Sequence, residues 1–108
     1  MEKVIVVKEA MEICDNDEEF LKEMVVLVRE DLECCLELLP KAFSRNDPAQ
    51  TREVAHRIKG QAANLAAKDL REKSGEVEDA AKAGTCTKTE YLQLILSIKE
   101  FIRCTRDV

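Results

Sequence analysis

The chain contains one histidine, His56, and three of its sequence neighbours within about one helical turn are basic. These neighbours are Arg52, Arg57 and Lys59, on a chain whose formal net charge is -5. A neutral imidazole with one unprotonated nitrogen is a usable nucleophile near pH 7. A local cluster of cations attracts phosphate or an acidic pocket. His56 is therefore a candidate nucleophile beside a basic spot that suits phosphate or an acidic pocket, and the alternative is a core or neutral surface histidine.

The periodicity around His56 predicts a helix that turns the histidine away from the core. On a wheel of about 100° per residue, the side opposite His56 is mostly apolar. It holds Thr51, Val54, Ala55, Ile58, Gln61, Ala62 and Leu65. The side of His56 itself holds Ala49, Arg52, Glu53, Lys59, Gly60, Ala63 and Ala67. We therefore expect a solvent-facing imidazole rather than a satisfied core histidine.

Small residues make the surface around His56 low and flat. Gly60 stands one turn after His56 in mid-helix, where glycine costs about 1 kcal/mol relative to alanine. Together with Ala49, Ala63 and Ala67 it forms a stripe without long side chains. Such a stripe would let the active site of another protein approach the imidazole closely.

The segment 55–67, AHRIKGQAANLAA, resembles the signature of histidine-containing phosphotransfer (HPt) domains. The resemblance extends over nearly the whole chain, and two positions depart from the pattern: Gln61 replaces a small residue, and Ala66 replaces a common glycine. The matching positions are His56, Ile58, Lys59, Gly60, Ala63, Asn64, Leu65 and Ala67.

This resemblance implies a phosphocarrier in a two-component phosphorelay, without kinase or ATP-binding activity of its own. His56 would accept a phosphoryl group from a receiver-domain aspartate and pass it to another, and Lys59 would offer positive charge to the phosphoryl oxygens. The implied partners are receiver domains of response regulators and of hybrid sensor histidine kinases. Magnesium would be held by the receiver, so we expect no cofactor and no metal site in this chain.

A candidate for orienting His56 is found by counting along a helical hairpin. If the next helix turns back near Ala67, the residue level with His56 is Glu78. A carboxylate there could accept the proton of one ring nitrogen and leave the other free. The alternative is that Glu78 is one more solvated charge beside Glu76 and Asp79.

The predicted receiver-docking surface surrounds His56. It combines the basic spot with the flat stripe and with apolar residues of the preceding helix that we expect to be exposed. On the histidine's helix it comprises Ala49, Arg52, Arg57, Gly60, Gln61 and Ala63; on the preceding helix it comprises Leu21, Val25 or Val28.

The elements that must position these residues are all helical. The periodicity predicts an antiparallel up-down four-helix bundle with a short additional N-terminal helix. Capping side chains are offered by Asp15, Asn16, Asp17 and Asp47. Pro48 suits the first position of a helix, and Gly84 suits the position after the end of one. Pro40 falls within an expected helix, which it could kink or end. The expected helices are 4–13, 18–43, 48–66, 68–83 and 87–105.

Length and composition favour one soluble cytoplasmic domain, residues 1–108. The acidic balance argues against a nucleic-acid partner, and no apolar run suits a membrane span or signal peptide. Five cysteines without a repeating spacing argue against a disulfide framework. The family resemblance makes a monomer the default.

Two other functions are compatible with parts of the pattern. A helical interaction module could use the flat stripe to bind a partner helix without any phosphoryl chemistry. A metal- or redox-responsive bundle could use Cys34, Cys35 and His56, but the wheel gives no reason for these side chains to converge.

Overall fold

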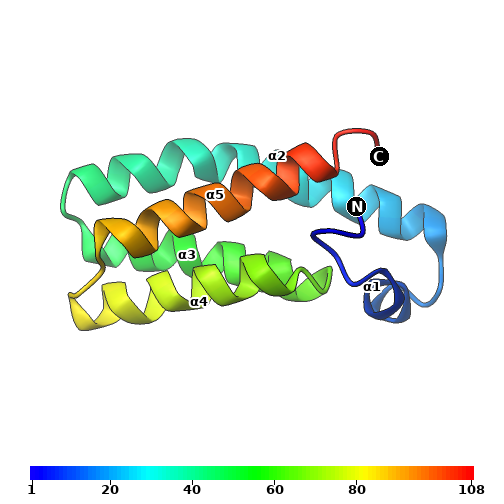
Figure 1. Ribbon diagram of the computed structural model, residues 1–108, viewed down its shortest axis with the longest axis horizontal. Helices are drawn as coiled ribbons and strands as arrows, with labels where there is room; N and C mark the ends of the chain where they lie inside the picture. Colours follow the sequence, from blue (N-terminus) through cyan, green and yellow to red (C-terminus); the bar gives the residue numbers. More distant parts are fainter.

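The protein is a bundle of four long antiparallel helices with a short helix at one end (Figure 1). The computed structural model describes all residues, 1–108. The helices are α1 (Val7–Ile13), α2 (Glu18–Ser44), α3 (Pro48–Asn64), α4 (Lys68–Ala83) and α5 (Lys88–Cys104). The all-helical fold predicted from periodicity is confirmed. None of the helices combines the length and apolar character that crossing a bilayer requires.

The helix boundaries follow from capping side chains. Asp17 accepts a hydrogen bond from the amide of Phe20 at 3.1 Å, and Asp47 accepts one from the amide of Gln50 at 3.0 Å. Thr87 and Glu90 form a reciprocal capping box at the start of α5. Each cap satisfies amides that would otherwise lack a partner at a helix N-terminus.

Five helix boundaries differ from the expected ones, by one to three residues. α1 begins at Val7 instead of Val4, and α3 ends at Asn64 because Ala66 adopts a left-handed backbone with φ of 53°. α2 continues past Pro40 to Ser44. A proline removes one helical hydrogen bond, but buried Leu39 and Ala42 on either side of it keep this turn packed on the bundle.

The core lies between the four long helices and is built from one stripe of each. α2 is the longest element, with 27 residues, and its N-terminal part extends beyond the other long helices, where α1 lies beside it (Figure 1). The amide of Val6 donates to the carbonyl of Ala66, which ties the segment before α1 to the α3–α4 turn. Fully buried side chains include Leu21, Val25, Leu32, Leu39, Ile58, Leu65, Val77, Leu94, Ile98 and Phe101.

The α4–α5 turn depends on a glycine. Gly84 follows the last residue of α4 with φ of 74°, the left-handed conformation that disfavours residues with a Cβ atom. Its amide donates to the carbonyl of Ala81, closing the helix end.

We expect Gly84→Ala to destabilise the fold by about 1 kcal/mol, because alanine is strained in the left-handed region. Urea unfolding monitored by far-UV circular dichroism measures this change. An unfolding midpoint equal to that of the wild type would contradict the assignment of Gly84 as a required C-terminal cap.

Candidate functional site

His56 lies in the middle of α3 and points away from the core. Its side chain is 73% exposed. The residues predicted on the opposite side of the helix are buried, except Gln61, which is half-buried. The helical wheel therefore predicted correctly which side of α3 is buried and which side is exposed.

A carboxylate on α4 contacts both His56 and Lys59. Glu78 Oε2 is hydrogen-bonded to Nδ1 of His56, and Glu78 Oε1 accepts a hydrogen bond from Nζ of Lys59 at 3.1 Å. The Glu78 side chain is only 12% exposed. The structure thus brings Glu78 to the level of His56, where the hairpin count placed it, and adds a contact to Lys59 that the count did not include.

The protonation of this network follows from the charge of Glu78. Burial raises the pKa of the Glu78 carboxyl, but hydrogen bonds from Lys59 and His56 outweigh this, so its pKa lies below the ordinary value. Glu78 is therefore ionised near neutral pH and can only accept hydrogen bonds. Nδ1 of His56 must then carry the proton, and in the neutral ring Nε2 keeps its lone pair.

A second carboxylate, on α2, holds two residues on the other side of His56. Asp31 Oδ2 accepts a hydrogen bond from Nε of Arg57 at 3.0 Å, and Asp31 Oδ1 accepts one from Nη2 of Arg57. Nε2 of Gln61 also donates to Asp31 Oδ2. The hydrogen bond from Arg57 is the main cause of the lowered pKa of Asp31. Arg57 and Gln61, both predicted for the docking surface, are thus joined to α2.

The flat stripe on the side of His56 is present. Three of its four expected residues, Ala49, Gly60 and Ala63, are exposed, as is Arg52 beside them. A Cβ atom added at Gly60 would have no atom within 4 Å outside the helix's own nearby backbone. Packing therefore does not explain a glycine at this position. Ala67 does not belong to the stripe, because α3 ends at Asn64 and Ala67 is buried at the start of α4.

The prediction that Leu21, Val25 or Val28 is exposed for docking is wrong. All three are buried, because they lie on the side of α2 that packs into the bundle. The exposed apolar residues of α2 are Phe20 and Leu27, and Met24 between them is half-buried. Leu27 precedes Asp31 by one turn, so the two side chains lie on the same side of α2.

Sequence reasoning missed Asp31. The hairpin count that identified Glu78 would have found it, because a turn centred on Asn46 places residue 31 level with Gln61. Asp31 itself carries no motif that separates it from neighbouring acidic residues.

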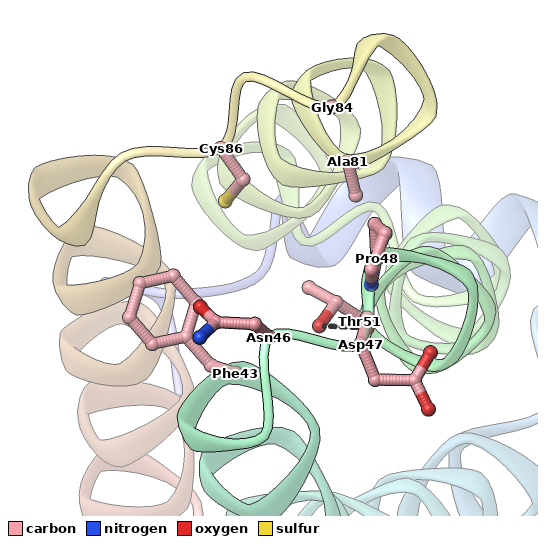
Figure 2. Close-up of a pocket in the computed structure, with 8 residues that line it drawn as sticks. All are labelled: Phe43, Asn46, Asp47, Pro48, Thr51, Ala81, Gly84 and Cys86. Atoms are coloured by element: carbon pink, nitrogen blue, oxygen red, sulfur yellow. Dashed lines mark hydrogen bonds between the residues drawn. The ribbon is translucent and has the colours of Figure 1, made fainter.

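One hollow lies elsewhere, at the end of the bundle with the α2–α3 and α4–α5 turns (Figure 2). Its volume is about 220 Å³, and none of the residues around His56 lines it. The five cysteines are free, and no three metal-ligating side chains gather in the chain. The lining residues are Phe43, Asn46, Asp47, Pro48, Thr51, Ala81, Gly84 and Cys86.

Two solved structures with this fold are described as an HPT domain and a histidine-containing phosphotransfer protein. The HPT domain of a sensor hybrid histidine kinase from Shewanella superposes with a TM-score of 0.83 at 18% identity, covering 92% of this chain and 87% of that one. Histidine-containing phosphotransfer protein B from Pseudomonas aeruginosa PAO1 superposes with a TM-score of 0.84 at 19% identity, covering 95% of this chain and 91% of that one. At these identities the likeness establishes the fold.

No curated protein sequence gives a significant match. The family model of the Hpt domain, however, matches residues 23–101, which include α3 and α4 entire and most of α2 and α5. The matched region thus covers most of the chain and contains His56, Lys59 and Glu78. The chain belongs to the Hpt domain family, whose members transfer phosphoryl groups in phosphorelays.

Proposed function

We propose that His56 accepts a phosphoryl group from the aspartate of one receiver domain and passes it to the aspartate of another. The observation that carries this proposal is an exposed imidazole whose Nδ1 is engaged by Glu78 while Nε2 remains available. Nε2 attacks phosphorus as the bond to the aspartyl oxygen breaks. The reverse reaction on a second receiver regenerates the neutral imidazole.

Glu78 is the orienting group in this proposal. By accepting the proton of Nδ1 it fixes the tautomer and balances the positive charge that develops on the ring when Nε2 forms a bond to phosphorus. Its own charge is shared with Lys59, so it attracts the imidazole without leaving a free anion beside the incoming phosphoryl group.

Lys59 supplies positive charge to the phosphoryl oxygens. Its side chain is 41% exposed and lies beside Gly75, where an added Cβ would approach the Lys59 Cδ atom at 3.8 Å. The stem of Lys59 therefore lies along α4, and the ammonium group stays near His56. Magnesium, which receivers hold with their own carboxylates, would complete the charge balance from the partner's side.

The receiver would dock on the stripe of α3 and on the exposed apolar residues of α2. This surface includes Arg52, Arg57, Gly60, Gln61 and Ala63, and Phe20, Met24 and Leu27 replace the buried residues first predicted. Exposed apolar residues beside a flat stripe are the composition expected at the centre of a protein interface.

The domain acts as a phosphocarrier without kinase activity, and we propose that it is a cytoplasmic monomer that binds no nucleic acid.

The central test is phosphoryl transfer from a panel of phosphorylated receiver domains to the purified protein. We expect the wild type to acquire an acid-labile, base-stable label and His56→Gln to acquire none. If no receiver in the panel labels the wild type, or if His56→Gln is labelled equally, the phosphocarrier proposal fails. An interaction module without phosphoryl chemistry would then account better for the flat stripe.

Gly60→Ala separates the needs of the fold from those of docking. We expect it to raise the free energy of unfolding by up to about 1 kcal/mol, because alanine favours the helix and the added methyl meets no neighbour. We expect the same change to slow transfer from a receiver, because the methyl group projects from the stripe beside His56. Urea unfolding and transfer kinetics measure the two effects.

Gly75→Ala is the matched control for Gly60→Ala. It replaces a mid-helix glycine of α4, and its methyl makes only an ordinary contact with Lys59. It should stabilise the protein similarly without slowing transfer. Equal transfer rates for Gly60→Ala and the wild type would show that the stripe need not be flat for docking.

Leu27 and Leu96 test the docking surface as a matched pair. Their exposures are close, 61% and 65%, but Leu27 lies on α2, on the side that carries Asp31, and Leu96 lies on α5. We expect Leu27→Glu to weaken receiver binding about tenfold or more, as loss of a well-packed interface residue does. Leu96→Glu should bind normally. Calorimetric titration with a receiver measures both, and equal affinities would remove α2 from the interface.

A further inference from the structure

Asp31 forms every side-chain hydrogen bond that links α2 with α3. Its two oxygens accept hydrogen bonds from Arg57, and Oδ2 also accepts one from Gln61. The Cys35 thiol approaches the same oxygen at 3.9 Å, and burial raises the pKa of this thiol to about 11, so it stays protonated. The carboxylate is 24% exposed and is held from three sides.

Arg57 directly follows His56 on α3, and its guanidinium is bound to Asp31 on α2. Asp31 engages Nε and Nη2 of this group in a two-bond arrangement, the geometry that fixes a guanidinium most firmly. The Arg57 side chain is still 45% exposed. Released from Asp31, its flexible side chain would be free to move toward a negatively charged group on His56.

Of the three cations near His56, Lys59 and Arg57 are paired with carboxylates, whereas Arg52, one turn before His56, has no carboxylate partner. Lys59 pairs with Glu78 on α4, and Arg57 pairs with Asp31 on α2. A phosphoryl group on Nε2 carries close to two negative charges and would attract any unpaired cation. A carrier must also give this group away, and a guanidinium bound to the phosphohistidine would stabilise the loaded form and oppose its release.

We propose that Asp31 is a positioning residue that holds Arg57 against α2 and away from the phosphoryl group carried by His56. The inference rests on the proposed function. In this arrangement Arg57 remains part of the docking surface, while its charge is withheld from the phosphohistidine. Gln61 supports the same carboxylate, which gives a role to a residue that departs from the small one usual in the family signature.

The test is the equilibrium of phosphoryl exchange between the protein and N-phosphoimidazole, followed by ³¹P NMR. The phosphorus–nitrogen bond of the donor, protonated on its second ring nitrogen, breaks as the bond to Nε2 of His56 forms. The donor leaves as neutral imidazole, and Nδ1 of His56 keeps its proton toward Glu78. Because His56 is the only histidine, one phosphohistidine signal reports the loaded protein. No receiver is needed, so weakened docking cannot affect the result.

We expect Asp31→Ala to shift this equilibrium toward the phosphorylated protein by about two- to fivefold, the range of a single exposed ion pair. The shift should vanish when Asp31→Ala is made in an Arg57→Gln background. Asp31→Asn, which retains the side-chain size, should give a smaller shift that vanishes in the same way. Glu30→Ala removes a neighbouring exposed charge of α2 and should give no shift.

Two results would overturn the inference. An unchanged equilibrium in Asp31→Ala would show that Arg57 does not reach the phosphoryl group when released. An equal shift with and without Arg57 would show that Asp31 acts through its own charge instead. Either result leaves receiver-dependent labelling of His56 untouched, whereas absence of that labelling would sink the phosphocarrier proposal alone.

Discussion

The hydrogen bond from His56 to Glu78 joins two helices, so the orientation of the imidazole depends on how closely α3 and α4 pack. Small buried side chains make this close packing possible, including Ala55 and Ala62 on α3 and Ser74 and Ala81 on α4. Ser74 satisfies its buried hydroxyl by donating to the carbonyl of Leu70 at 2.7 Å. Larger residues here would separate the helices and move Glu78 out of reach of Nδ1.

The surroundings of His56 repeat one arrangement on two sides. A carboxylate from a neighbouring helix, Glu78 or Asp31, contacts two residues of α3, and one of each pair is a cation. The pKa of each carboxyl is lowered in the fold. Each therefore contributes stability above its unfolded pKa, and this contribution is lost as the pH falls through the folded pKa. Acid weakens both attachments of α3 together.

The sequence allowed the architecture and the main site contact to be predicted because both depend on local rules. Capping residues and periodicity determine the helices, and a short turn determines which residues of a hairpin lie level, which is why Glu78 was found. The errors arise where burial depends on how the helices pack against each other, which a local sequence pattern does not contain. The broad apolar surface of α2 contains both core and exposed positions, and its pattern alone did not separate Val25 from Leu27.

Ala67 and Asp31 show the same limit of local patterns: Ala67 was wrongly included in the site, and Asp31 was missed. The wheel extended α3 beyond its true end and counted buried Ala67 as part of the stripe. Asp31 required the register of a second hairpin, which composition and motifs do not reveal. Gly60 lies at the other extreme: its helix position was predicted, and the structure adds that no packing neighbour requires a glycine there. A residue that weakens its own helix without improving the packing is best explained by what must approach His56 from outside.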